Sequence, residues 1–208
     1  MTKKQINKEV KVVDLGLPSG RLWADRNIGA KSPEDFGLYF SWGNTDGHAL
    51  GTDYEFSSAA YKKTPGAKLD GNIDAEHDAA TVNLGAPWRM PTREDFVELV
   101  DNCTFDYCSL NGYRVMKLTS KINGNSLFFA CSGLGTGTGW YLVGSDGCYW
   151  SASIDFVAHA RYLLFYSGGV FPPGQQRSVR RFCGAPCSVI IPPNSIRNAI
   201  HYVKNKSY

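Results

Sequence analysis

Four histidines are spread over the chain, and none of them has the neighbours that a metal site needs. Histidine ligands on one helix are usually four residues apart, and further ligands lie close by in the sequence. That spacing occurs at none of His48, His77, His159 and His201, and we expect the carboxylates near His77 to face water. We interpret all four as ordinary surface or core residues, and we predict no metal ion and no other cofactor.

Acid–base catalysis needs two carboxylates in different surroundings. Two segments that we predict to be helical contain seven acidic residues, namely Asp74, Glu76, Asp78, Glu94, Asp95, Glu98 and Asp101. Charged side chains on a helix normally face water. We therefore expect these carboxylates to form solvated helix faces, and we predict no catalytic residue among them.

Six cysteines leave one alternative in which the protein is an enzyme. No CxxC pair is present to begin a zinc site, and the spacing is too irregular for a disulfide scaffold, so we expect mostly free or buried thiols. Cys183 and Cys187 lie in the segment RFCGAPCS, where Arg180 and Arg181 could lower the pKa of a thiol. The sequence shows no partner base for either cysteine.

Glycines at positions 133, 135, 137 and 139 have a spacing that suggests a phosphate-binding loop. Such a loop continues into GKS or GKT and into a helix whose N-terminus faces the phosphate. Neither the motif nor a predicted helix follows these glycines. We predict a flexible loop from Ser132 to Gly147.

Positive charge is concentrated in the last quarter of the chain. Residues 151–208 contain 7 Lys/Arg and 1 acidic residue, whereas the first 150 residues contain 15 and 18. Arginines there alternate with aromatic residues, which is typical both of nucleic-acid-binding surfaces and of protein recognition surfaces. The net charge of +3 and the pI of about 8.5 are modest for a nucleic-acid-binding protein. We predict a protein or glycan partner and no nucleic acid.

Short strands and turns are the elements that would position these residues in the first part of the chain. A Pro-Ser-Gly turn between two apolar runs predicts a hairpin over residues 10–24. Residues 32–35 predict a single helical turn, residues 38–42 an aromatic strand, and residues 43–73 a surface loop.

Two helices are predicted next. The first covers residues 74–84 and ends at Gly85. The second begins after Thr92, because the Thr92 hydroxyl and the Asp95 carboxylate have the spacing of a capping box.

The rest of the chain predicts antiparallel strands. An Asn-Gly turn at residues 123–124 favours a hairpin between the two strands that flank it. The predicted strands cover residues 113–118, 126–130, 148–151, 161–166 and 188–191. The tail from Asn194 has the apolar spacing of a short amphipathic helix.

The composition is that of one folded domain. Of the 208 residues, 43% are hydrophobic and 20% are charged, and the mean hydropathy is -0.27. These values exclude a disordered, collagen-like or membrane-spanning chain. No run of 18 apolar residues occurs, and residues 1–10 lack the apolar core of a signal peptide. We predict a single α+β domain over residues 1–191 and a tail over residues 192–208.

The stretch VDLGLPSGRLWA at residues 13–24 is similar to the opening of the Fibrobacter-type major paralogous domain, which is common in gut Bacteroidetes. Further matching motifs follow in the same order and extend the resemblance over roughly residues 10–170. They are NIGA at 27–30, PEDFG at 33–37, YFSWG at 39–43, DAA at 78–80, WRMPT at 88–92, NCT at 102–104, NGNS at 123–126 and YWS at 149–151. Eight or more motifs in register form a specific signal.

The WRMPT motif followed by an acidic helix also resembles the formylglycine-generating-enzyme branch of the C-type lectin fold. This resemblance implies an α+β, C-type-lectin-like fold in which two helices flank small twisted antiparallel β-sheets. Enzymes of that branch use cysteines and a metal that cannot be placed in this sequence, and fold alone does not imply function. Calcium-dependent sugar binding is not implied either, because no Glu-Pro-Asn or Gln-Pro-Asp motif occurs.

The segment that begins YWSAS at residues 149–153 resembles the end of variable proteins of diversity-generating retroelements, which is rewritten at template adenines. Randomising the two adenines of an AAC or AAT codon never yields Lys, Glu, Gln, Met or Trp. In the 36 residues 154–189 only Gln175 and Gln176 are of these types, against 27 among the other 172 residues. We predict a variable region over residues 154–189.

Within this region, scaffold residues of the family pattern alternate with chemically miscellaneous ones. The scaffold residues are Leu163, Phe165, Gly168 and Val170, and beyond them the closing strand aligns either with Ser178-Val179-Arg180 or with Ser188-Val189. Such alternation is typical of a strand with one buried and one presented side. The side chains that we predict to contact a ligand are Phe156, His159, Arg161, Tyr162, Leu164, Tyr166, Phe171, Gln175, Gln176, Arg180 and Phe182.

The sequence thus predicts a non-enzymatic binding protein that recognises a protein or glycan on a target surface, without inserting into a membrane. The resemblance implies a phage or gut bacterial source, and the absent signal peptide favours a phage virion or tail. A cytoplasmic location and display on the cell surface by another route are the alternatives. Two other functions stay open: a fixed structural or adhesin component, and, less favoured, a formylglycine-generating type of enzyme that uses Cys183 and Cys187.

Overall fold

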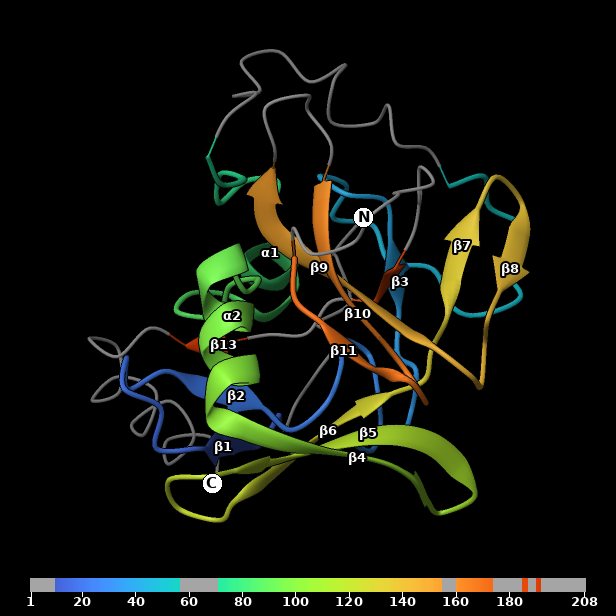
Figure 1. Ribbon diagram of the computed structural model, residues 1–208. Helices are drawn as coiled ribbons and strands as arrows, with labels where there is room; N and C mark the ends of the chain where they lie inside the picture. Colours follow the sequence, from blue (N-terminus) through green and yellow to red (C-terminus); the bar gives the residue numbers. More distant parts are fainter. Residues whose placement is uncertain (1–9, 57–70, 155–159, 174–184, 187–189, 192–208) are drawn as a thin grey trace, which may run out of the picture.

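A computed structural model describes residues 10–56, 71–154, 160–173, 185–186 and 190–191 (Figure 1). The helices within these residues are α1 (Ala79–Leu84) and α2 (Arg93–Asn102). The strands are β1 (Val12–Asp14), β2 (Leu22–Ala24), β3 (Tyr39–Phe40), β4 (Cys103–Leu110), β5 (Tyr113–Ser120), β6 (Ser126–Ala130), β7 (Leu134–Thr136), β8 (Gly139–Tyr141), β9 (Gly147–Ile154), β10 (Ala160–Tyr166), β11 (Gly169–Phe171), β12 (Ala185–Pro186) and β13 (Ile190–Ile191).

These strands form small antiparallel sheets with the orders β1-β2-β13, β11-β10-β9, β12-β3, β4-β5-β6 and β7-β8. In Figure 1, α2 lies beside β9 and β10, and the β4-β5-β6 sheet lies below them. The predicted α+β class with antiparallel sheets is confirmed, with little helix in the described residues. No helix among those residues is long and apolar enough to cross a membrane.

Both predicted helices are present. Helix α1 begins later than expected, because residues 75–77 form a turn and Asp78 caps the helix at its N-terminus. Gly85 ends it with a φ of 81°, a conformation that glycine adopts without strain. Helix α2 begins with the predicted capping box: the Thr92 hydroxyl accepts from the Asp95 amide, and the Asp95 carboxylate accepts from the Thr92 amide.

The hairpins β1–β2 and β5–β6 confirm two predictions, and three further regions correct the sequence analysis. Strand β4 was not predicted, although it continues directly from α2 and pairs with β5 along its whole length. The segment predicted as a flexible loop at 132–147 contains the β7–β8 hairpin. Residues 32–35 form a turn rather than a helix. The predicted tail helix from Asn194 lies outside the described residues.

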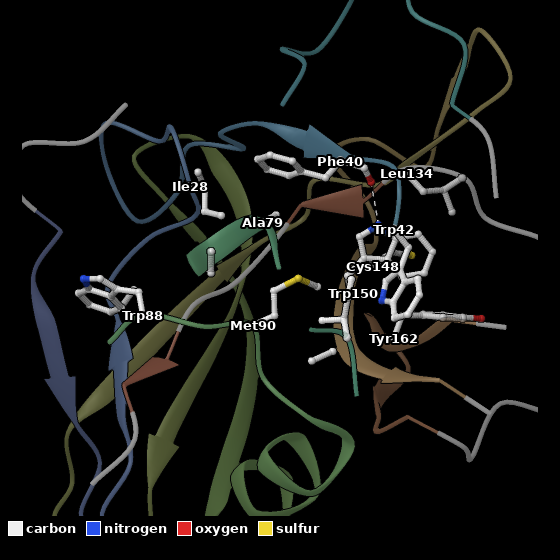
Figure 2. Close-up of a cluster of buried hydrophobic side chains, with 14 residues drawn as sticks. Ile28, Phe40, Trp42, Ala79, Trp88, Met90, Leu134, Cys148, Trp150 and Tyr162 are labelled. Carbon is white, nitrogen blue, oxygen red and sulfur yellow. Dashed lines mark hydrogen bonds between the residues drawn. The ribbon is translucent and has the colours of Figure 1, made fainter. Parts of the chain in front are cut away.

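Two clusters of buried side chains form the core. Figure 2 shows the first, in which Phe40, Trp42, Met90, Trp150 and Tyr162 pack together, and the Trp150 indole donates a hydrogen bond to the Phe40 carbonyl at 2.8 Å. The second cluster lies under α2 and on the β4-β5-β6 sheet; it includes Leu15, Trp23, Phe96, Leu99, Leu118, Phe129, Tyr149, Leu163 and Phe165. Because alternate residues of β9 and β10 enter different clusters, these two strands separate the two halves of the core.

Candidate functional site

Strand β10 carries the middle of the predicted ligand face. It pairs with β9 on one side and with β11 on the other. Side chains alternate along a strand, so Tyr162, Leu164 and Tyr166 lie on one side of the sheet, while Leu163 and Phe165 lie on the other. Leu163 and Phe165 are fully buried in the second cluster, as predicted for scaffold residues of this strand.

The prediction that one whole side of β10 is presented is wrong. Tyr162 is only 3% exposed, and its ring meets Trp150 edge to face with centroids 6.3 Å apart (Figure 2). Burial raises the pKa of the Tyr162 phenol far above its ordinary value. Arg161 was expected beside Tyr162, but the alternation assigns it to the side of Leu163. The sheet is therefore covered on both sides where β10 begins.

The exposed part of the predicted face lies where β10 turns into β11. Tyr166 is 37% exposed and stacks on the half-buried Phe171, with ring centroids 5.4 Å apart and planes 18° apart. Leu164 is paired with Phe171 across the two strands and is half-buried. The Tyr166 ring also covers Gly168, where an added Cβ would come within 2.4 Å of the ring. We call Leu164, Tyr166 and Phe171 the outer patch.

The C-terminal end of β9, which pairs with the start of β10, departs from the regular ladder and forms hydrogen bonds to other elements. Ala160 pairs with Ile154, whereas Tyr162 pairs with Trp150, so β9 has two more residues than β10 between these pairs. These residues bond elsewhere: the Ser151 carbonyl accepts from the Trp42 indole, and the Ala152 amide donates to the Pro91 carbonyl. Such a bulge redirects the strand, and here it joins the start of the predicted variable region to the scaffold.

Six of the predicted ligand residues lie outside the described residues, so they stay predictions: Phe156, His159, Gln175, Gln176, Arg180 and Phe182. The same holds for Cys183 and Cys187, on which the enzyme alternative depends. Of the predicted set, the structure brings Leu164, Tyr166 and Phe171 together.

The expectation of solvated helix faces is wrong for Asp78 and Asp95, which are buried, and for Glu98, which is half-buried. Asp78 accepts hydrogen bonds from the amides of Ala80, Thr81 and Met90 at 2.9 to 3.2 Å. Desolvation nevertheless raises the pKa of the Asp78 carboxyl above its ordinary value. This carboxylate joins the start of α1 to the WRMPT segment, which gives that motif a structural explanation.

Asp95 connects the same segment to the N-terminal hairpin. Its carboxylate lies 2.8 Å from Arg89 and 2.6 Å from Arg21, while it also caps α2. One turn further along α2, Glu98 accepts hydrogen bonds from the amide and the hydroxyl of Ser19. In these buried or half-buried pairs each charged or polar group has a partner. Asp95 and Glu98 therefore hold the β1–β2 hairpin against α2 and do not face water.

Three of the four described cysteines are buried, and all four are free. Burial raises the pKa of the thiols of Cys103 and Cys131 to about 11 and that of Cys148 to about 12. Thiols with such pKa values carry almost no thiolate near neutral pH, so these three are unsuited to nucleophilic chemistry. Among the described residues no group of three His, Cys, Asp or Glu side chains is placed to hold a metal ion.

Comparison with models of protein families, with curated proteins and with solved structures found no match.

Proposed function

We propose that the protein is a non-enzymatic binding protein that recognises a protein or glycan on another surface through the outer patch and the adjoining variable residues. The observation that carries the proposal is the change along one side of β10, from the buried Tyr162 to the exposed Tyr166 stacked on Phe171. An aromatic pair with one exposed and one half-buried ring on a short hairpin supplies contact area at low cost in side-chain entropy. The two-sided core beneath keeps the hairpin in place, which reduces the ordering cost of binding.

The finer fold assignment is part of the same proposal. Two helices beside small antiparallel sheets are what the resemblance to the C-type lectin fold implies, and the described elements have that composition. On this proposal residues 154–189 are diversified by a retroelement, and residues that vary reach the surface at the outer end of the sheet. A phage virion or tail is the proposed location, with the cytoplasm and surface display as alternatives.

Sequencing of the genomic locus tests the diversification. The proposal expects a downstream near-copy of the codons for residues 150–191 that differs from them only at its adenines, together with a reverse-transcriptase gene. A locus without a near-copy would remove the diversification and favour a fixed structural or adhesin component.

Binding is tested on arrays of defined glycans and on a panel of intact bacterial cells. We expect the double variant Tyr166→Ala/Phe171→Ala to lose at least tenfold in affinity for each hit, because it removes the aromatic contact area. The control is Tyr113→Ala, which removes a 51% exposed tyrosine from β5, outside the outer patch. Equal binding by the double variant and the wild type would show that the outer patch is not the recognition surface.

A further inference from the structure

A second group of aromatic side chains lies away from the outer patch, between the loop that follows β3 and the β7–β8 hairpin. We call Tyr39, His48, Tyr54, Phe56 and Trp140 the aromatic cluster. Phe56 is only 2% exposed, and the half-buried rings of Tyr54 and Trp140 both meet it edge to face. Their centroids lie 4.9 and 5.2 Å from that of Phe56, with planes 78° and 81° apart. Phe56 thus forms the buried base of the cluster, and the partly exposed rings of Tyr54 and Trp140 pack against it.

Backbone contacts hold this arrangement in place. The Phe56 amide donates to the Gly137 carbonyl at 2.8 Å, and His48 and Tyr39 exchange two backbone hydrogen bonds of 2.9 Å. Gly135 is required beneath Phe56, since an added Cβ would lie 2.6 Å from the Phe56 ring. The His48 ring stacks on Tyr54 with centroids 3.5 Å apart. A ligand would therefore meet preformed aromatic surfaces, with little ordering cost.

The loop around the cluster is acidic. No lysine or arginine occurs between Lys31 and Lys62. Asp46, Asp53 and Glu55 are exposed, and none of the three forms an ion pair with another described residue. The β7–β8 hairpin contributes no charge of its own. Negative potential and aromatic faces thus occur together, which is the combination that attracts organic cations.

A neutral His48 imidazole is compatible with the binding of an organic cation at this cluster. Desolvation lowers the pKa of the His48 imidazole, and the nearby Asp46 carboxylate acts in the opposite direction. Near neutral pH the ring therefore adds no positive charge beside Tyr54, and the local field is set by the carboxylates.

We propose that the aromatic cluster binds an arginine or lysine side chain of a basic protein segment. A guanidinium or ammonium group over the face of Trp140, or over the face of Tyr54 that points away from His48, gains cation–π energy. The carboxylates of the loop attract it from a distance. A protein segment fits better than a small free cation, because Leu50, Tyr141 and Leu142 of the same loop and hairpin expose apolar surface. This site is independent of the outer patch and of the proposed function.

The probe is an acetylated and amidated peptide of three Gly-Arg repeats, and its neutral counterpart contains citrulline in place of arginine. Trp140 reports binding by fluorescence, because Trp23, Trp42, Trp88 and Trp150 are all buried. We expect the arginine peptide to shift the emission at low salt and the citrulline peptide to leave it unchanged. Equal responses to both peptides would overturn the proposal.

Variants separate the aromatic contribution from the charge. We measure the affinity for the arginine peptide by isothermal titration calorimetry. We expect Trp140→Leu to weaken this affinity roughly 3- to 30-fold and Tyr113→Leu to leave it unchanged. If Trp140→Leu fails to fold, Tyr54→Leu replaces it. The triple variant Asp46→Asn/Asp53→Asn/Glu55→Gln should weaken binding and reduce its salt dependence.

Two outcomes would contradict the assignment. Full affinity in the aromatic variants, with loss only in the triple variant, would reduce the site to unspecific attraction by acidic side chains. Tetramethylammonium that binds as tightly as the arginine peptide would identify a site for small cations and remove the protein segment as its occupant.

Discussion

The two ends of β10 give the same residue type opposite surroundings. Tyr162 and Tyr166 lie on one side of the strand, four residues apart, yet the first is buried against Trp150 and the second is exposed beside Phe171. The difference comes from what covers the sheet, since the first core cluster includes Tyr162 but not Tyr166. Alternation along a strand therefore identifies the side of a residue but not its exposure.

The largest effect that tests this comparison is expected for Phe165→Ala. The Phe165 ring is fully buried and packs beside both Phe129 and Tyr149, with centroids 6.2 and 5.9 Å away. Removing it leaves a cavity, and the free energy of unfolding should fall by roughly 3–5 kcal/mol. Tyr166→Ala, one residue further on, should cost less than about 1 kcal/mol. Urea denaturation of the two variants measures the contrast, which similar losses would refute.

How far the sequence predicted the scaffold can be judged from its hairpins and helix starts. Thr92 with Asp95, Gly85, and the Asn-Gly turn at 123–124 are local signals with one structural solution, and the structure contains all three. Strand β4 was missed although a second Asn-Gly pair precedes β5. Asn111 and Gly112 both have positive φ, 49° and 86°, as a two-residue hairpin turn requires. That signal was present in the sequence and could have identified the strand.

The next effect compares two glycines that both lie under an aromatic ring. A Cβ at Gly147 would come within 1.9 Å of the buried Phe165 ring, and a Cβ at Gly168 within 2.4 Å of the exposed Tyr166 ring. The Phe165 ring has no free space, so Gly147→Ala should cost roughly 1–3 kcal/mol. Tyr166 can swing into solvent, so Gly168→Ala should cost less than about 0.5 kcal/mol. Thermal unfolding of the pair checks the order, and a larger loss at Gly168 would contradict it.

The candidate site was less predictable than the scaffold, for reasons that concern tertiary structure. Exposure of Tyr162 or Tyr166 depends on Trp150 and on a core assembled from distant segments, which no local pattern contains. The burial of Asp78 and Asp95 has the same origin, because their partners Met90 and Arg21 come from other segments. The composition of residues 154–189 did direct attention to β10, yet it could not distinguish the two ends of the strand.

The smallest effect is expected for Arg161→Ser, which tests whether the predicted variable positions tolerate change. Arg161 is half-buried and lies at the irregular point of the β9–β10 ladder, where the residues opposite it on β9 bond to the Trp42 and Pro91 segments instead. Because the ladder is held by backbone hydrogen bonds and not by the Arg161 side chain, the free energy of unfolding should change by no more than about 0.5 kcal/mol. Leu163→Ser on the same side of β10 is the matched comparison. Its free energy of unfolding should fall by several kcal/mol, because the substitution places a hydroxyl in the second cluster. Urea denaturation of both variants distinguishes a tolerant position from a structural one. A loss at Arg161 comparable to that at Leu163 would place Arg161 in the scaffold and restrict the variable surface of β10 to its outer end.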